Sequence, residues 1–235
     1  MLKKLFFCIF FFHLSNVNAW AVELYTEDFP PYNYMENGEL KGIGFDVIEQ
    51  LSQKIGEKPS IKVLPWSRAY KYAKEIPGAA IFSIVRTSGR EKSFHWVGPL
   101  FSVRVSLFAL AGKRDLYRGN NAERLDIARK VAGIGVQQDG AGEEFLKNLK
   151  FQNLDAITNV KQSLYLLLKD RYDLLETSEE FISYAAEKEG ILVDKFSRVA
   201  FIGNYDMYLA FSKKTSQETI QKWQNALEQI QQTRR

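Results

Sequence analysis

Short apolar runs rich in β-branched residues alternate with longer amphipathic stretches along almost the whole chain, and this alternation constrains the fold most. Residues 79–85 form a nearly continuous apolar run, which predicts a buried strand. Residues 45–55 have apolar side chains at helical spacing, and Gly56 follows as a helix-ending residue. Because strands that alternate with helices form βαβ units, the pattern predicts an α/β protein.

Two such rounds of strands and helices follow each other, which favours two lobes. Prolines at 30 and 31 predict a turn, and Asn37-Gly38 predicts a hairpin. The expected strands cover residues 22–26, 61–64, 79–85, 103–111, 131–137, 172–175, 200–201 and 208–211. The expected helices cover residues 45–55, 67–75 with Ser67 as N-cap, 143–149, 161–168, 181–188 and 217–232.

The first nineteen residues have the layout of a secretory signal peptide. Lys3 and Lys4 precede an apolar run over residues 5–12, and Val17-Asn18-Ala19 offers a small-residue cleavage site. The run is far shorter than the roughly 20 residues that cross a bilayer, so a retained membrane helix is not expected. We therefore expect residues 1–19 to be a cleaved signal peptide and the mature chain to be periplasmic.

The single cysteine, Cys8, lies inside that peptide. The mature chain is therefore expected to have no disulfide and no cysteine metal site, which suits a bacterial periplasm. His95 would be its only histidine, so we expect a structural role for it and neither a metal site nor a cofactor. Without Lys3 and Lys4, 30 basic residues face 28 acidic ones, and no long basic block is present. Nucleic acid is therefore not an expected partner.

The stretch SIVRTSGREKSFHWVGPL, residues 83–100, places Arg86 and Arg90 four positions apart in a turn rich in small polar residues. An arginine in such a turn suits a carboxylate, because the planar guanidinium donates two parallel hydrogen bonds. A solvated basic turn between two core strands is the alternative. Arg86 fits either a brace for the turn or a residue at a hinge.

Four segments resemble the family 3 bacterial extracellular solute-binding proteins, the periplasmic amino-acid-binding receptors of ABC transporters. The first is LYTEDFPPYNYMENGELKGIGFDVIEQLSQKIG, with an aromatic-Pro-Pro-aromatic turn and a G-x-x-F-D helix start. The second is SIVRTSGREKSFHWVGPL, with a serine on the strand and a T-x-x-R turn. IGVQQDGAGEEFL and LLKDRYDLL are the third and fourth. Together they cover most of residues 22–212 in the family's order.

This resemblance implies a two-lobed, type II periplasmic-binding-protein-like fold. Each lobe would have a mixed sheet flanked by helices, and two crossings would form the hinge. The first lobe would comprise residues 20–105 and 200–235, and the second residues 106–199. The lobes would close over a small carboxylated ligand, an amino acid or a related compound. The protein, which we expect to be a monomer, would deliver this ligand to the permease of an ABC transporter.

The resemblance also assigns first-lobe residues to the ligand. Arg90, at the end of T-x-x-R, would pair with the ligand's carboxylate, and Thr87 begins that motif. Ser83, on the preceding strand, would offer its hydroxyl. Phe29 would stack on the ligand.

Further residues complete the expected site. The turn at Gly140 and Ala141, just before a helix, would add main-chain N–H donors for an anionic group. Trp66 is an additional aromatic expected near the rim of the cleft. Tyr205 and Asp206 are expected in a first-lobe loop near the hinge rather than on the ligand.

One position departs from the family's pattern. Many amino-acid binders have an aspartate for the α-ammonium after the second-lobe strand, and the matching position here is Ser178. Glu176 or Glu179 could take its part. We expect a binding protein without catalytic residues, because no nucleophile–base pair is present.

Two alternatives remain. Some proteins of this fold are periplasmic cyclohexadienyl dehydratases, in which a carboxylic acid of the cleft protonates a leaving group, and Glu176 is the candidate acid here. The other alternative is a ligand sensor with no role in transport.

Overall fold

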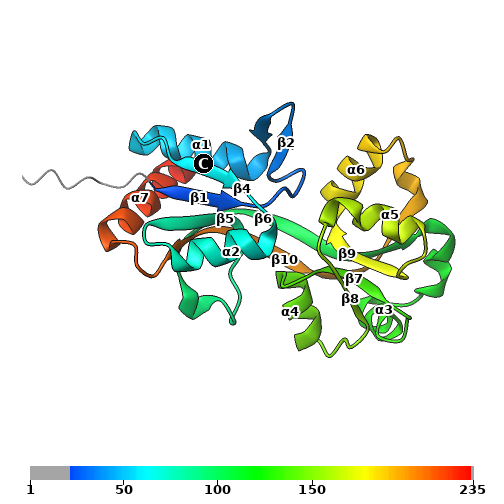
Figure 1. The fold of residues 1–235 in the computed structure, drawn as a ribbon. Helices are drawn as coiled ribbons and strands as arrows, with labels where there is room; N and C mark the ends of the chain where they lie inside the picture. The colour runs from blue at the N-terminus through cyan, green and yellow to red at the C-terminus, as the bar shows by residue number, and fades with distance from the viewer. Residues whose placement is uncertain (1–21, 234–235) are drawn as a thin grey trace, which may run out of the picture.

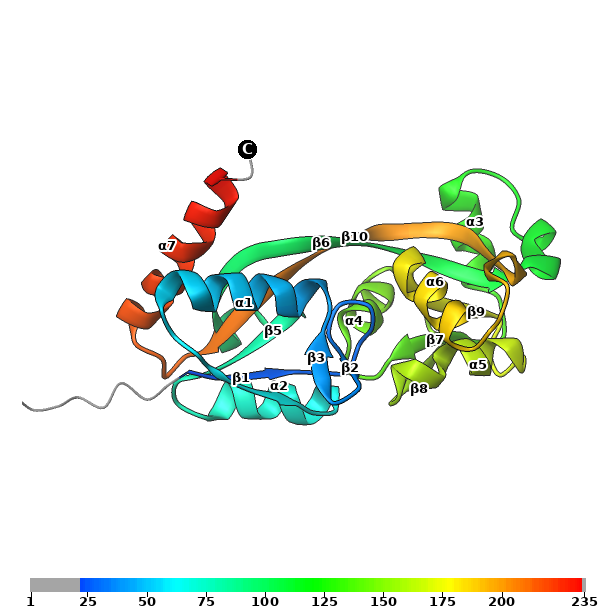
Figure 2. The same ribbon diagram turned by 90° about the horizontal axis from the view of Figure 1, so that it is seen from above.

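The computed structural model describes residues 22–233, so the predicted signal peptide lies outside the described residues. Two lobes lie side by side (Figure 1), and two long strands run from one lobe to the other (Figure 2). Each lobe contains strands covered by helices, which confirms the predicted α/β class. Within residues 22–233, no helix combines the length and the apolar character needed to cross a membrane.

The elements follow one another along the chain in the alternating order that the sequence predicts. The strands are β1 (Glu23–Thr26), β2 (Tyr34–Glu36), β3 (Glu39–Lys41), β4 (Ser60–Val63), β5 (Ala79–Val85), β6 (Phe94–Leu110), β7 (Ile134–Gln137), β8 (Leu154–Ile157), β9 (Leu174–Ser178) and β10 (Phe196–Ser212). The α-helices are α1 (Ile43–Ile55), α2 (Trp66–Glu75), α3 (Asn121–Ala128), α4 (Ala141–Asn148), α5 (Ser163–Leu168), α6 (Glu179–Lys188) and α7 (Gln217–Thr233).

Eight strands form one continuous sheet in the order β4-β1-β5-β10-β6-β9-β7-β8, and β2 and β3 form a separate hairpin. In the first lobe β1 pairs in parallel with β4 and β5, and in the second lobe β7 pairs in parallel with β8 and β9. The central strands β6 and β10 are antiparallel to each other and to their outer neighbours β9 and β5. The mixed sheets expected for the two lobes are therefore halves of one sheet that passes through the hinge.

β6 and β10 form both crossings between the lobes. They pair from Phe94 with Ser212 in the first lobe to Leu110 with Phe196 in the second. The short strands expected at 200–201 and 208–211 are parts of β10, because strand pairing continues through the polar residues between them. The register shifts at three places, and such bulges allow a strand pair to bend. The expected lobe boundaries at about 105 and 200 fall inside these strands.

Alternating residues along the first-lobe strands supply two separate cores. Leu24 and Phe82 pack with α1 and α7 on one face of the sheet, whereas Tyr25 and Ile81 pack with α2 on the other (Figure 1). This is the two-residue period of a strand that is covered on both sides. Trp223 of α7 is fully buried in the first of these cores, so the C-terminal helix is part of the first lobe.

The second lobe follows the same scheme. Leu107 of β6 joins a core with residues of α3 and α4, and its neighbour Phe108 joins a core with residues of α5 and α6. Helix α3 and strand β8 were not expected from the sequence. The Asn120 side chain accepts hydrogen bonds from the first turn of α3, and the main-chain amide of Asn120 donates one to the Glu123 carboxylate, so a capping box begins this helix.

Local backbone chemistry sets two helix starts beside the cleft. The N-cap of α1 is Gly42, which has φ of 114°, and a Cβ there would lie 2.4 Å from the Tyr32 carbonyl oxygen. The glycine of G-x-x-F-D is therefore required by the backbone. Helix α2 begins at Trp66 with Pro65 at its N-cap, so the expected N-cap at Ser67 is wrong. This start places the buried Trp66 at the first position of the helix.

The burial of Trp223 predicts a large effect on stability. We expect Trp223→Ala to lower the free energy of unfolding by about 3–5 kcal/mol, because it removes a large buried side chain and leaves a cavity. Urea unfolding followed by circular dichroism measures this change. Gln232→Ala, at an exposed position of the same helix, is the control, and equal effects of both substitutions would contradict the role of α7.

Candidate functional site

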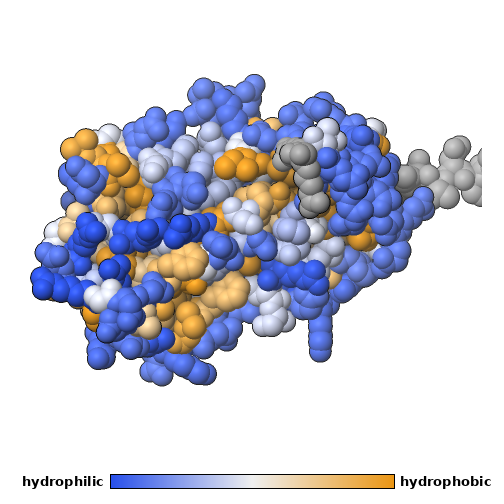
Figure 3. Space-filling model, turned by 180° about the vertical axis from the view of Figure 1, so that it is seen from behind, coloured by the Kyte–Doolittle hydropathy of each residue, from blue (hydrophilic) through white to orange (hydrophobic). Residues whose placement is uncertain are grey.

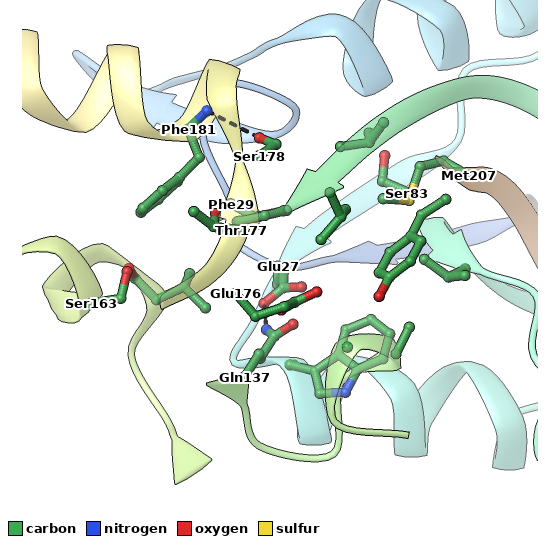
Figure 4. Close-up of a pocket in the computed structure, with 18 of the residues that line it drawn as sticks. Glu27, Phe29, Ser83, Gln137, Ser163, Glu176, Thr177, Ser178, Phe181 and Met207 are labelled. Atoms are coloured by element: carbon green, nitrogen blue, oxygen red, sulfur yellow. Dashed lines mark hydrogen bonds between the residues drawn. The ribbon is translucent and has the colours of Figure 1, made fainter. Parts of the chain in front are cut away.

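A cavity of about 80 Å³ lies between the two lobes, which is room for several water molecules. Both lobes line it, and the crossing strands contribute Val103, Val105, Tyr205 and Met207. Figure 4 shows polar side chains from both lobes directed into this space among apolar ones. The cavity lies at the carboxyl ends of parallel strands of both lobes, where open α/β sheets commonly hold ligands.

The structure brings together most of the residues that the sequence assigned to a ligand. Six of the eight line the cavity, namely Phe29, Trp66, Ser83, Arg90, Ala141 and Glu176. Thr87 and Gly140 do not line it: Thr87 contacts the second lobe, and Gly140 is the N-cap of α4 at the outer mouth of the cleft. Contact with a ligand stays a prediction for all eight residues.

The guanidinium of Arg90 is held by main-chain carbonyls of both lobes. Nη1 donates to the Val85 carbonyl at 3.1 Å, and Nη2 donates to the carbonyl of Asp139, in the second lobe, at 2.9 Å. The guanidinium carbon lies 4.9 Å from the ring centre of Trp66 and 5.7 Å from that of Tyr70. Arg90 is only 6% exposed, and burial lowers its pKa from the ordinary value, although an arginine remains charged in such a site.

A carboxylate of helix α4 joins the second lobe to the turn that follows β5. Thr87 donates its hydroxyl to Glu144 Oε2 at 2.7 Å, and the Gly89 amide donates to Glu144 Oε1 at 3.2 Å. Beside this contact, Trp66 Nε1 donates to the same Asp139 carbonyl that Arg90 binds, at 2.9 Å. We call these contacts to Asp139 and Glu144 the closure contacts, because they hold the lobes together at one rim of the cavity.

The opposite rim is closed by aromatic residues. The Tyr32 hydroxyl lies 2.7 Å from Ser178 Oγ and 3.2 Å from Glu180 Oε2, both in the second lobe. Ser178 also accepts a hydrogen bond from the Phe181 amide and thereby caps α6 (Figure 4). Phe29 stacks on Phe181 with 5.9 Å between ring centres. Ser178, the position that the resemblance matches to an aspartate, is therefore a helix cap bonded to the first lobe.

Glu176 brings a carboxyl from β9 into the cavity. It packs against the first turn of α4, where a Cβ at Gly142 would come within 2.3 Å of the carboxyl group, so a glycine there makes room for it. The Tyr205 hydroxyl interacts with this carboxyl without forming a hydrogen bond of good geometry. Burial raises the pKa of Glu176 to about 7, and Tyr205 offsets only part of the rise.

Glu27 brings a second carboxyl from the other lobe. It follows β1 directly and accepts a hydrogen bond from the side-chain amide of Gln137, at the end of β7. Burial raises the pKa of Glu27 to about 7, although the Gln137 hydrogen bond and the charge of Arg90 act in the opposite direction. Two carboxyls that titrate near neutrality therefore face one cavity (Figure 4).

Ser83 is the residue where β5 departs from regular strand geometry. It has φ of 59° opposite a register shift in β10. Its hydroxyl donates to Asn33 Oδ1 at 2.9 Å, so its only proton is already used within the first lobe. A positive φ at a non-glycine residue is a strained conformation that occurs preferentially at functional sites.

Four residues were missed or misplaced by the sequence analysis. Tyr205 and Asp206 lie within β10, so the expected loop is wrong, and Tyr205 lines the cavity. Glu27 and Gln137 were not singled out. Each lies at the carboxyl end of an expected parallel strand, and this position is the signal that could have identified both.

No group of three or more histidine, cysteine, aspartate or glutamate side chains within residues 22–233 is arranged to hold a metal ion. The titratable groups that line the cavity are Glu27, Arg90, Glu176 and Tyr205. Their arrangement favours binding through hydrogen bonds and charge.

The family follows from comparison with known proteins. Residues 24–235 match the profile of the bacterial extracellular solute-binding proteins, family 3. The chain belongs to this family. A comparison with curated protein sequences found no significant match.

Solved structures of low sequence identity share the fold of this solute-binding protein. A histidine kinase sensor domain with similarity to periplasmic binding proteins has a TM-score of 0.76 and 17% identity, over 90% of this chain and 91% of its own. The arginine-, lysine-, histidine-binding protein ArtJ from Geobacillus stearothermophilus has a TM-score of 0.73 and 20% identity, over 91% and 90%. The ancestral amino acid-binding protein AncCDT-1, a precursor of cyclohexadienyl dehydratase, has a TM-score of 0.74 and 16% identity, over 90% and 89%.

The closure contacts predict that Glu144 keeps the lobes together. Glu144→Ala removes the acceptor of the Thr87 and Gly89 hydrogen bonds, so we expect the solute-free protein to open and its radius of gyration to increase in small-angle X-ray scattering. Glu187→Ala, an exposed residue of α6 in the same lobe, is the control. An unchanged scattering curve for Glu144→Ala would show that these hydrogen bonds do not hold the lobes.

The raised pKa of Glu176 predicts how stability depends on pH. An unfolded glutamate ionises at a pKa of about 4.3, whereas Glu176 in the folded protein ionises near 7. Between these values the unfolded state loses its proton first, so the free energy of unfolding falls as pH rises. We expect Glu176→Gln to reduce this fall in solute-free protein, as measured by urea unfolding at pH 5 and pH 8. Glu179→Gln, at an exposed position of α6, should leave the fall unchanged.

Proposed function

We propose that this protein is a periplasmic solute-binding protein that closes its lobes over a small solute with a cationic nitrogen and delivers it to an ABC importer. The observation that carries the proposal is the pair of carboxyls, Glu27 from the first lobe and Glu176 from the second, in one cavity. A cation between them would contact both lobes at once. Contacts that exist only when a solute bridges the lobes shift the equilibrium toward the closed state.

The chemistry of the cavity suits an ammonium or a related group. Such a cation donates several hydrogen bonds, and carboxylates are the strongest acceptors for them. A buried carboxylate without an ion-pair partner is costly, and burial is the reason that both groups have a raised pKa. A bound cation supplies the missing partner and favours the ionised forms.

Delivery to a transporter is supported by the family and by the N-terminal sequence. Solute-binding proteins of this family are extracellular, and residues 1–19 have the features of a cleaved export signal. ArtJ, which shares the fold, is a binding protein for arginine, lysine and histidine. The sensor alternative would use the same cavity and differ in the partner that receives the signal.

An enzymatic alternative is favoured by one observation, the raised pKa of Glu176. A glutamic acid that remains protonated near neutral pH could act as a general acid, as a dehydratase requires. The alternative predicts turnover of prephenate or arogenate that is lost in Glu176→Gln. The binding function predicts no turnover by either protein.

Calorimetric titration tests the proposed function. The protein is unfolded, dialysed and refolded to remove any solute that copurifies, and is then titrated with basic amino acids and aliphatic amines. We expect at least one of them to bind, and we expect Glu27→Gln and Glu176→Gln each to weaken that binding by about tenfold or more, because hydrogen bonds to charged groups contribute about 1.5–3 kcal/mol. Glu179→Gln should bind as the wild type does.

The affinity measured in these titrations is expected to depend on pH. The affinity should increase from pH 6 to pH 8, because both carboxyls must ionise before they pair with a cation. Glu176→Gln should reduce this increase. An affinity that is the same at both pH values in the wild type would contradict ion pairing with these carboxyls.

A further inference from the structure

We propose that the solute is an organic cation without a carboxylate, such as an aliphatic amine or diamine. This inference rests on the proposed function and narrows the chemical class of the solute. It also differs from the sequence-based expectation that Arg90 pairs with a ligand carboxylate. Its basis is the hydrogen bonding of the first-lobe side-chain donors around the cavity and the charge of the groups that line it.

The first-lobe side chains that the resemblance assigned to a carboxylate each donate to an acceptor of the protein. Two guanidinium nitrogens of Arg90 donate to the carbonyls of Val85 and Asp139. The indole of Trp66 donates to Asp139 as well, and the hydroxyl of Ser83 donates to Asn33. A ligand carboxylate that took the Nη2 hydrogen bond of Arg90 would displace the Asp139 carbonyl, and with it a contact that joins the lobes.

The turn of the T-x-x-R motif binds a carboxylate of the protein itself. Glu144 accepts from the hydroxyl of Thr87 with one oxygen and from the amide of Gly89 with the other. Both contacts cross from the first lobe to the second. Glu144 and the Asp139 carbonyl thus provide the oxygens that an anionic ligand would otherwise supply at this rim.

The carboxyl of Glu176 has unused acceptor capacity inside the cavity. Glu176 forms no ion pair within the described residues, and the hydroxyl of Tyr205, which is 7% exposed, has no hydrogen bond of good geometry there. A carboxylate accepts several hydrogen bonds, and Tyr205 can donate only one, so Glu176 keeps acceptor capacity for a further donor. A nitrogen with several N–H groups provides that donor, and a carboxylate does not.

The charged groups of the cavity also favour an organic cation without a carboxylate. Glu27 and Glu176 are the acidic groups that line it, and Arg90 is the basic one, already held between two carbonyls and two aromatic rings. A carboxylate on the ligand would add a third negative group to a small, enclosed space. Much of the remaining wall is apolar and suits methylene groups, with Phe29, Val105, Ile157, Leu175, Phe181 and Met207.

Matched pairs of ligands that differ only in the α-carboxylate test the inference. The pairs are agmatine with arginine, cadaverine with lysine, and putrescine with ornithine, each titrated calorimetrically into protein that has been unfolded and refolded. We expect the amine of at least one pair to bind at least tenfold more tightly than its amino acid. Tighter binding of the amino acid in each pair that binds, or equal binding, overturns the inference and leaves the proposed function intact. Absence of binding by all six compounds overturns both.

The substitution Arg90→Met distinguishes two roles of Arg90, binding of a ligand carboxylate and contact between the lobes. The substitution keeps an extended side chain against Trp66 but removes the guanidinium. If no carboxylate contacts Arg90, amine and amino acid lose affinity by the same factor, and their ratio stays constant. A ratio that shifts tenfold toward the amine shows that Arg90 binds the carboxylate and overturns the inference. Arg90→Lys, which keeps the charge, provides the same comparison if Arg90→Met fails to fold by circular dichroism.

Discussion

The antiparallel pairing of β6 with β10 is the constraint on which the rest of the structure depends. Each strand has 17 residues and belongs to the cores of both lobes. The same pair supplies part of the cavity lining between the lobes. The position of the first-lobe turn relative to α4, and therefore of Arg90 relative to Asp139, follows from how this strand pair bends.

Several helices and strands could be predicted from the sequence, because the spacing of their apolar residues depends only on neighbouring positions in the chain. The strand β5 and the hairpin turn at Asn37-Gly38 were predicted correctly, and α7 was predicted to within one residue. The continuity of β10 could not be predicted, since Gly203, Asn204 and Asp206 have low strand propensity and are retained by pairing with β6. Tertiary hydrogen bonding overrides local preference at such positions.

The candidate site likewise has parts that local motifs predict and parts that depend on contacts between distant residues. Short sequence motifs identified Arg90, Ser83 and Phe29, which line the cavity. Each motif lies within one continuous stretch of the chain. What Arg90 binds depends on Asp139, 49 residues later, and no single-sequence pattern connects the two. The accumulation of negative charge was likewise hidden, because Glu27 and Glu176 come from opposite lobes and meet only in the folded protein.

The continuous eight-stranded sheet has a mechanical consequence. Lobes joined by loops would rotate freely, but here any separation of the lobes must bend a hydrogen-bonded ribbon whose register shifts concentrate the curvature. A change in the angle between the lobes therefore has to be accommodated within this strand pair, at its register shifts. The hydrogen bonds between β6 and β10 thus link the angle between the lobes to the shape of the cavity, because residues of the same two strands line it.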